Sequence, residues 1–170
     1  MRPSPLQLND YWVDSLTFDT NYDHEPSTPT EVITAQDLVV EVHESINPEN
    51  DLQRSCNLSI ELKESAEARF PWRFSVSLIG FFQIDENWPH DKNSLFSANA
   101  PAVLYSAARE ALASVSGRGP HREVLLPSVT FIKLPTESKQ LPPPAETRPQ
   151  GGAKAPVKSA RKTASKRTKR

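Results

Sequence analysis

The sequence predicts an α+β fold: a four-stranded antiparallel meander with one long helix packed on its apolar face, followed by a disordered tail. Three observations lead to this class. Apolar and polar residues alternate over four separate stretches, which is typical of strands whose successive side chains leave opposite faces. One alanine-rich stretch has helical spacing. The last part of the chain, 136–170, has no apolar periodicity.

The two clearest strands lie in the middle of the chain. Between 52 and 62 the odd positions are polar, and the even positions are Leu52, Arg54, Cys56, Leu58, Ile60 and Leu62. The stretch 70–84 repeats this pattern with apolar residues at its even positions, and Ile79 and Phe81 are apolar exceptions on its polar side. Both stretches are expected to bury one face.

Two earlier stretches show the same period less clearly. Residues 38–46 place apolar side chains on one face at 38, 40, 42 and 46. Residues 6–18 place on one face Leu6, Leu8, Trp12, Leu16 and Phe18. Asp10 and Asp14 interrupt that face, which a bulge or an edge position could accommodate.

The connections favour antiparallel pairing of consecutive strands. Residues 47–51 have turn chemistry, because Asn and Asp bond their own backbone and Pro fixes φ. The link 64–69 is also short. Neither link is long enough for the helix that a parallel crossover needs, so the sequence favours a meander.

The helix is expected from Ala100 to Ser116. Asn99 is a suitable N-cap, and Pro101 then falls in the first turn, where its missing N–H has no cost. Gly117 supplies the stop. After it, 124–132 is a short apolar stretch divided by Pro127, which is typical of an edge strand or an extended loop.

The chain is expected to form one domain, 1–135, and a disordered proline-rich linker and basic tail, 136–170. The charge divides in the same way. Residues 1–147 hold 11 of the 20 basic residues and all 21 acidic ones, a net charge of −10, whereas 148–170 carry +9. Each block therefore needs its own interpretation, and the tail has too little apolar surface to offset its ordering entropy.

No catalytic, metal-binding or cofactor-binding motif is found. The four histidines are scattered without zinc-ligand spacing to Cys56, and there is no glycine-rich phosphate loop. One cysteine forms no internal disulfide, and no apolar stretch approaches the ~20 residues that span a bilayer. The sequence predicts a cytoplasmic protein that is not an enzyme, with no transmembrane segment.

Several linked motifs in the second half of the chain resemble one family. They are, in order, GFFQI at 80–84, NAPAVLY at 99–105, ARE at 108–110, SGRG at 116–119 and LLPSVTF at 125–131. Their order and spacing resemble the SecB protein-export chaperone family. The segment from Leu6 to Asp19 also looks like that family's first strand, so the resemblance covers about 6–132.

The resemblance implies a four-stranded antiparallel sheet with a long helix on it, assembled as a dimer of dimers with the helices between eight-stranded sheets. It also implies a holdase that binds unfolded or precursor polypeptides in extended apolar grooves without ATP. Proteins of this family deliver their clients to the motor ATPase SecA, and some relatives instead protect an antitoxin.

Large aromatic side chains suit such a groove, because they bury much area without fixed hydrogen-bond partners. The candidates for polypeptide binding are Trp12, Phe18, Phe81, Trp88 and Tyr105. The alternative for each is ordinary packing in the core or at a subunit interface. For motor binding, Asp19 matches one family acid, whereas the other falls on Ser15 with Asp14 beside it.

Two features depart from the family or extend it. Residues 133–135 and the triple proline at 142–144 replace the second helix that normally flanks the groove. The basic tail has no aromatic residue for base stacking, so any nucleic-acid binding would be non-specific and directed at phosphates. Its candidate residues for an anionic partner are Lys158, Arg161, Lys162, Lys166, Arg167, Lys169 and Arg170.

Three functions follow from these patterns. The first is a holdase for protein export, and the second is a chaperone dedicated to an antitoxin, suggested by the replaced second helix. The third is an oligomeric scaffold that binds nucleic acid through its basic tail. A solvated linker, or a tail that folds back on the acidic part, is the alternative for 148–170.

Overall fold

The computed structural model describes residues 3–24, 31–119, 121 and 123–132. The chain divides into two units, Met1–Leu134 and Pro135–Arg170, and every described residue belongs to the first. The predicted boundary after residue 135 and the predicted disordered tail lie outside the described residues, so both stay predictions.

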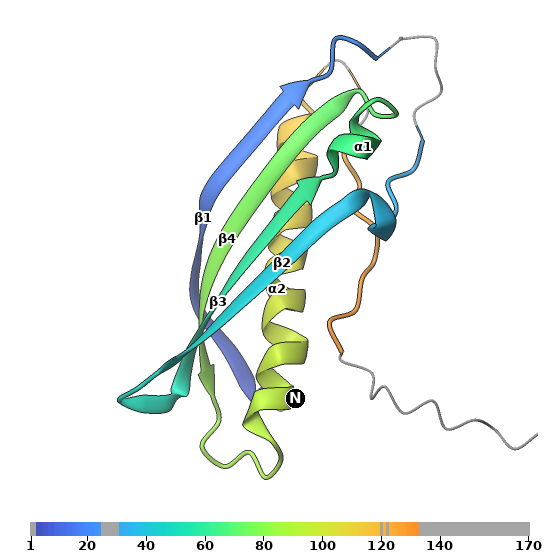
Figure 1. The fold of residues 1–170 in the computed structure, drawn as a ribbon. Helices are drawn as coiled ribbons and strands as arrows, with labels where there is room; N and C mark the ends of the chain where they lie inside the picture. The colour runs from blue at the N-terminus through green and yellow to red at the C-terminus, as the bar shows by residue number, and fades with distance from the viewer. Residues whose placement is uncertain (1–2, 25–30, 120, 122, 133–170) are drawn as a thin grey trace, which may run out of the picture. The chain divides into compact units, whose positions relative to one another are not determined.

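Four strands form one antiparallel sheet: β1 (Leu6–Thr20), β2 (Leu38–Asn47), β3 (Asn50–Leu62) and β4 (Trp72–Ile84). Their order across the sheet is β1-β4-β3-β2 (Figure 1). The predicted four-stranded antiparallel sheet is therefore confirmed. The meander holds for β2, β3 and β4 only, because β1 lies beside β4 and not beside β2.

The lengths of the connections explain this order. Two residues separate β2 from β3, and the link from β3 to β4 holds only the short helix α1 (Glu64–Glu67). Residues 21–37, which include the 3-10 helix η1 (Ala35–Asp37), separate β1 from β2. This longer connection lets the first strand occupy the far edge, as in a Greek key.

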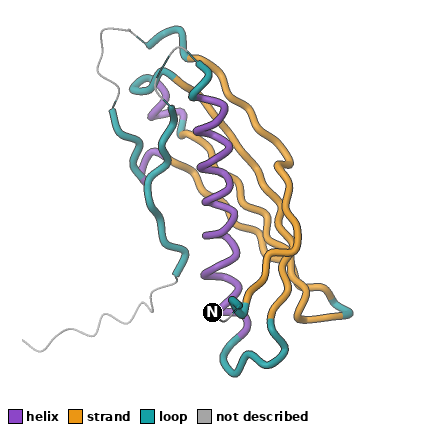
Figure 2. The backbone as a smooth tube through the Cα atoms, turned by 180° about the vertical axis from the view of Figure 1, so that it is seen from behind, coloured by secondary structure: helices purple, strands orange, loops and turns teal. Residues whose placement is uncertain are grey.

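The core lies between one face of the sheet and the long helix α2 (Lys92–Ser116). Even-numbered residues of β3 and β4 point into it, and they meet Phe96, Leu104 and Leu112 of α2, all fully buried. Figure 2 shows from behind how α2 lies along this face of the sheet. The predicted long helix on the apolar face is confirmed.

The opposite face of the sheet, called the outer face below, is rich in serine. Ser59 on β3 donates to Ser77 on β4 (Oγ–Oγ 3.3 Å), and Ser77 donates to the Asn57 side chain (3.1 Å). These short polar side chains bond to one another across the strands. Most of the outer face is consequently polar.

Gly80 lies where β4 packs tightly against α2. A Cβ at this position would lie 2.7 Å from Leu104 Cδ2 and 2.9 Å from Phe82 Cε2. Both of those side chains are in the core. The absence of a side chain at Gly80 therefore lets the helix lie directly on the sheet.

The helix begins at Lys92, eight residues before the predicted start, and the prediction of Asn99 as its N-cap is wrong. Asp91 is the N-cap, and its carboxylate accepts hydrogen bonds from the backbone N–H groups of Asn93 and Ser94 (3.0 Å each). Pro101 lies inside the helix and not in its first turn. Burial of Phe96 and its neighbours holds the first turns in place and outweighs the bond lost at the proline.

After α2, residues 123–132 run back beside the helix as an extended segment without strand pairing. The Tyr105 hydroxyl donates to the Pro127 carbonyl (2.8 Å), and the Val124 N–H donates to Ser116 Oγ (2.7 Å). Of the two predicted alternatives for this stretch, the structure has the extended loop. Val124 and Leu126 anchor it in the core.

Candidate functional site

Trp12 on β1 and Phe81 on β4 meet on the outer face of the sheet. Their ring centroids lie 5.0 Å apart, with 33° between the ring planes. Trp12 is 46% exposed and Phe81 is 39% exposed, so each ring keeps apolar surface in contact with water. Ile79 lies opposite Trp12 in the β1–β4 pairing. We call Trp12, Ile79 and Phe81 the outer patch.

The first of two irregularities in β1 puts Trp12 on this face, and the second returns the later residues to the original alternation. The pairing of β1 with β4 skips Asn9 and again Asp14. Because strand side chains alternate, each extra residue moves the ones that follow to the opposite face. The residues of the predicted β1 face that do point to the helix are Leu6, Leu8, Leu16 and Phe18. The prediction that Trp12 shares their face is therefore wrong.

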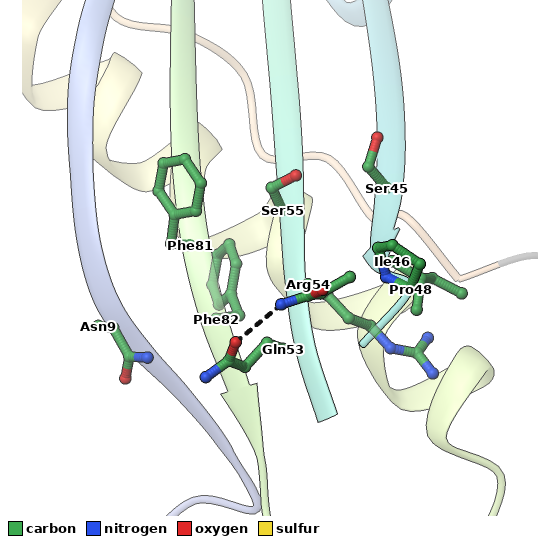
Figure 3. Close-up of a pocket in the computed structure, with 10 residues that line it drawn as sticks. Asn9, Ser45, Ile46, Pro48, Gln53, Arg54, Ser55, Phe81 and Phe82 are labelled. Carbon is green, nitrogen blue, oxygen red and sulfur yellow. Dashed lines mark hydrogen bonds between the residues drawn. The ribbon is translucent and has the colours of Figure 1, made fainter. Parts of the chain in front are cut away.

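A hollow of about 420 Å³ adjoins the outer patch at the β2–β3 hairpin (Figure 3). Its lining residues are Asn9, Ser45, Ile46, Asn47, Pro48, Gln53, Arg54, Ser55, Phe81 and Phe82. The Asn47 amide donates to Gln53 Oε1 (3.0 Å) at its rim. Phe81 belongs to both features, so the outer patch continues into a hollow with hydroxyl and amide groups along its edge.

The other three predicted aromatics pack inside the molecule. Phe18 faces the helix side, lies opposite Phe74 and packs partly buried against the core. Tyr105 is 5% exposed and bonded to the segment after α2. Trp88, in the loop between β4 and α2, packs against the core with the His90 ring 5.1 Å away. The structure thus brings two of the five candidates together on the surface.

The two predicted acids on β1 have different surroundings. Asp19 lies on the outer face opposite Arg73, and Asp14 is one of the two unpaired residues of the irregular strand. Arg73 Nε lies 2.8 Å from a carboxylate oxygen of Glu67. Ser15 shares the outer face with Asp19. Arg73 therefore lies beside Asp19, the one acid of β1 that matches an acid on the first strand of the family.

The sequence reasoning missed a second apolar surface along β1. Leu8, Tyr11 and Val13 point to the helix side but remain 37%, 44% and 43% exposed. We call these three residues the β1 strip. The break in alternation around Asn9 could have indicated it, because a bulge at that position brings Tyr11 and Val13 to this side.

The seven predicted tail residues lie outside the described residues: Lys158, Arg161, Lys162, Lys166, Arg167, Lys169 and Arg170. Within the part of the chain that the structure describes, no group of three or more His, Cys, Asp or Glu side chains is placed to hold a metal ion. No helix among those residues is long and apolar enough to cross a membrane.

Cys56 is the buried cysteine of β3. Burial, with the nearby Glu44 carboxylate, raises the pKa of its thiol to about 12. A thiol with so high a pKa stays protonated at neutral pH and is a poor nucleophile. Cys56 is therefore a packing residue.

A four-stranded antiparallel sheet covered on one face by a long helix, with apolar surface left exposed on both faces of β1, defines a SecB-like chaperone fold. The family model for SecB, preprotein translocase subunit SecB, matches residues 3–141. This match covers most of the chain, and the chain belongs to the SecB family. Proteins of this family are chaperones and not enzymes.

The solved structures that are similar to this chain include the following two. The Mycobacterium tuberculosis Rv1957 SecB-like chaperone, in complex with a ChAD peptide from the Rv1956 HigA1 antitoxin, has a TM-score of 0.55 and 15% identity, and the match covers 74% of this chain and 91% of that one. A protein of unknown function from Streptococcus agalactiae has a TM-score of 0.46 and 14% identity, over 73% and 97% of the two chains. The first likeness supports the fold. No curated protein sequence matches.

Proposed function

We propose that this chain is an ATP-independent holdase that binds non-native polypeptides through the outer patch. The observation that carries the proposal is the pairing of Trp12 and Phe81 on a rigid sheet, with each ring more than a third exposed. Exposed apolar patches of this kind mark interaction sites. Aromatic rings also bury much area without demanding a particular hydrogen-bond partner, so they suit varied clients.

The neighbouring hollow adds a second element of recognition. Its volume of about 420 Å³ accommodates side chains of a bound segment, and its rim offers the hydroxyls of Ser45 and Ser55 and the amide of Gln53. Such neutral groups can hydrogen-bond the backbone of any sequence. None of these contacts needs a nucleotide, and the net charge of −10 on residues 1–147 attracts basic segments at long range.

We further propose that the protein works in the cytoplasm as a homo-oligomer, a dimer of dimers. The β1 strip supports this assembly, because Leu8, Tyr11 and Val13 lie on the helix side and α2 leaves them exposed. A second copy would cover them. Delivery of precursors to the motor ATPase SecA is the role that membership of the SecB family favours. Arg73 beside Asp19, and Ser15 in place of the second acid, would weaken that contact.

The test compares two states of one client. The full chain, without nucleotide, is titrated with a permanently unfolded, reduced polypeptide and with the folded form of the same polypeptide. We expect selective binding of the unfolded form. The double variant Trp12→Ala/Phe81→Ala should bind it roughly 10- to 100-fold more weakly, as for other aromatic contact residues.

Tyr22→Ala is the matched control, because Tyr22 is a 92% exposed aromatic residue outside the outer patch. This variant should bind like the parent. Equal binding of the folded and unfolded forms would exclude the holdase function. An unchanged affinity of the double variant would exclude the outer patch as its site.

A chaperone dedicated to an antitoxin is the second candidate. The Rv1957 structure, whose fold this chain shares, holds a peptide from an antitoxin. The expectation that residues 133–135 and the triple proline at 142–144 replace the family's second helix would also favour a specialised client. A gene neighbourhood without a toxin–antitoxin pair would count against this candidate, as would equal affinity for unrelated unfolded chains.

A further inference from the structure

We infer that this protein has a second partner, a nucleic acid, which the basic tail 148–170 binds through its phosphates. This activity is separate from the proposed holdase function and does not depend on it. Two observations carry it together: the residue types of the tail, and the charges that the described part of the chain presents.

The tail concentrates positive charge without any acid to neutralise it. It holds nine Lys and Arg and no Asp or Glu, and seven of the nine lie in its last 13 residues. Blocks of like charge of this kind are typical of arms that bind nucleic acid. Fully extended, 13 residues span at most about 45 Å, and one strand of a duplex presents roughly 13 phosphates over that length. Each of the seven cations can therefore reach a phosphate.

The described part of the chain carries the opposite charge. It holds seven Lys and Arg and 18 Asp and Glu, a net charge of −11. Three of its seven cations form ion pairs with described acids: Arg69 with Glu31 and Asp37, Arg73 with Asp23 and Glu67, and Lys92 with Asp51. These three are already neutralised by their neighbours.

The other four cations of the described residues do not form a basic patch. Arg54 is buried, and the Lys63 ammonium donates to a backbone carbonyl. Arg109 and Arg118 are exposed, but they are nine residues apart, which is roughly 13 Å along a helix. A polyanion that approaches the described part therefore meets mainly negative charge and is repelled. Attraction of a nucleic acid is left to the tail.

The composition of the tail favours a nucleic acid over an anionic membrane. Segments that lie on a membrane bury Trp, Phe or Leu in it, whereas the tail has none of these residues, and Val157 is its one large apolar side chain. Hydroxyl side chains, which donate to phosphate oxygens together with Lys and Arg, lie between the basic residues at Ser159, Thr163, Ser165 and Thr168. The tail thus matches a row of phosphates.

Binding through phosphates has a measurable signature, because each contact releases counterions. The logarithm of the affinity then falls linearly with the logarithm of the salt concentration. Seven contacts predict a slope of about −5 for single-stranded RNA and about −6 for duplex DNA. At a slope of −5, a rise from about 50 to about 200 mM salt lowers the affinity roughly 1,000-fold.

The experiment titrates the full chain into labelled single-stranded RNA of about 20 nucleotides and duplex DNA of about 20 base pairs, between about 50 and about 200 mM salt. The variant Lys166→Gln/Arg167→Gln/Lys169→Gln/Arg170→Gln removes four of the seven cations. Its slope should be shallower by about 3 for RNA and about 4 for DNA, with binding at least about tenfold weaker at the lowest salt. Fluorescence anisotropy measures both quantities.

Two controls separate the tail from the rest of the chain and charge from sequence. Arg109→Gln/Arg118→Gln removes the two exposed cations of the described part and should change neither affinity nor slope. A chain in which residues 154–170 are reordered at the same composition should bind like the parent, because phosphates are recognised by charge and carry no sequence information.

Three results would overturn the inference. They are no binding of either nucleic acid by the full chain at the lowest salt, equal binding by the parent and the four-residue variant, and tighter binding to vesicles of phosphatidylserine than to RNA. The last result would make a membrane surface the partner. Each of them leaves the holdase function standing, because selectivity for unfolded polypeptide is measured separately and depends on Trp12 and Phe81. Binding of either nucleic acid with the expected slope supports the inference, and the tighter of the two identifies the partner as RNA or DNA.

Discussion

Gly80→Ala adds one methyl group where β4 packs tightly against α2, and its effect follows from three distances. The new Cβ would lie 2.7 Å from Leu104 Cδ2, 2.9 Å from Phe82 Cε2 and 3.3 Å from Phe82 Cζ. Favourable contacts between carbon atoms begin near 3.5 Å. The side chains of Leu104 and Phe82 must therefore each move by roughly 0.6–0.8 Å, which is the shortfall in the two closest distances.

The magnitude comes from two opposing terms. Leu104 is fully buried and Phe82 is 1% exposed, so neither can move into solvent, and overpacking of this kind costs about 1–3 kcal/mol. Replacing glycine in a strand interior by alanine contributes about 0.5–1 kcal/mol in the other direction. We expect a net loss of roughly 0.5–2 kcal/mol, and a Tm lower by about 2–8 °C.

Denaturation by urea at one fixed protein concentration measures this loss, because the stability of the proposed assembly would depend on concentration. Leu104→Ala alone should cost about 2–5 kcal/mol by leaving a cavity. In the double variant the methyl group added at position 80 occupies part of that cavity, so the two costs should sum to more than the observed loss by about 1 kcal/mol.

Two results would refute this reasoning. A Gly80→Ala variant as stable as the parent would mean that the contact with Leu104 is not tight. Strict additivity with Leu104→Ala would mean that the two positions do not share one packing site.

Three further predictions concern single side chains. Asp91→Ala removes the N-cap of α2 and should cost about 1 kcal/mol in urea denaturation, whereas an unchanged midpoint would show that packing alone fixes the start of the helix. Hydrogen bonds from Thr34, with a smaller contribution from Arg69, lower the pKa of the Asp37 carboxyl from 3.8. This carboxylate therefore stabilises the fold above about pH 4 and loses its effect as pH falls through the lowered pKa. The Asp37→Asn variant should have a smaller free energy of unfolding at pH 7 than the parent, and should lose less of it on acidification. Parallel profiles of stability against pH for the variant and the parent would contradict this. With a thiol pKa raised to about 12, Cys56 should not react with iodoacetamide at pH 8 until the protein unfolds. Mass spectrometry follows the labelling, and rapid labelling of the native chain would disprove the burial of this thiol.

The strands of the core could be predicted from the sequence because their alternation has one physical cause. The even-numbered residues of β3 from Arg54 to Leu62 and those of β4 are buried on the helix side, whereas the odd-numbered side chains face outward. Ile79 and Phe81 broke that pattern, and they belong to the outer patch. The exceptions to the alternation thus pointed to the candidate site.

The position of β1 could not be predicted, because it depends on contacts distant in sequence. Pairing with β4 joins residues as far apart as Leu6 and Ile84, and no local pattern states which edge a strand will occupy. The face of Trp12 depends on which residue of β1 is left unpaired. Asp10 and Asp14 indicated a bulge, but the residues skipped are Asn9 and Asp14.

The start of α2 was missed for a local reason. Asn99 followed by a proline two residues later has the form of a helix start, and Asp91 stands just after a Trp-Pro-His sequence that reads as a loop. Burial of Phe96 in the core instead fixes the start of the helix before this residue. The free energy gained by burying an aromatic ring exceeds the local preference of a capping residue and a proline for a helix start.

The place of β1 in the sheet also sets the order in which the chain can fold. β2, β3 and β4 are joined by short links and can close as a local unit, whereas the contact between Thr17 and Ser75 closes a loop of 58 residues. We expect substitutions in β3 to slow folding, and substitutions in β1 mainly to speed unfolding, in stopped-flow measurements. The strand that carries Trp12 and the β1 strip would then be the last to dock and the first to detach.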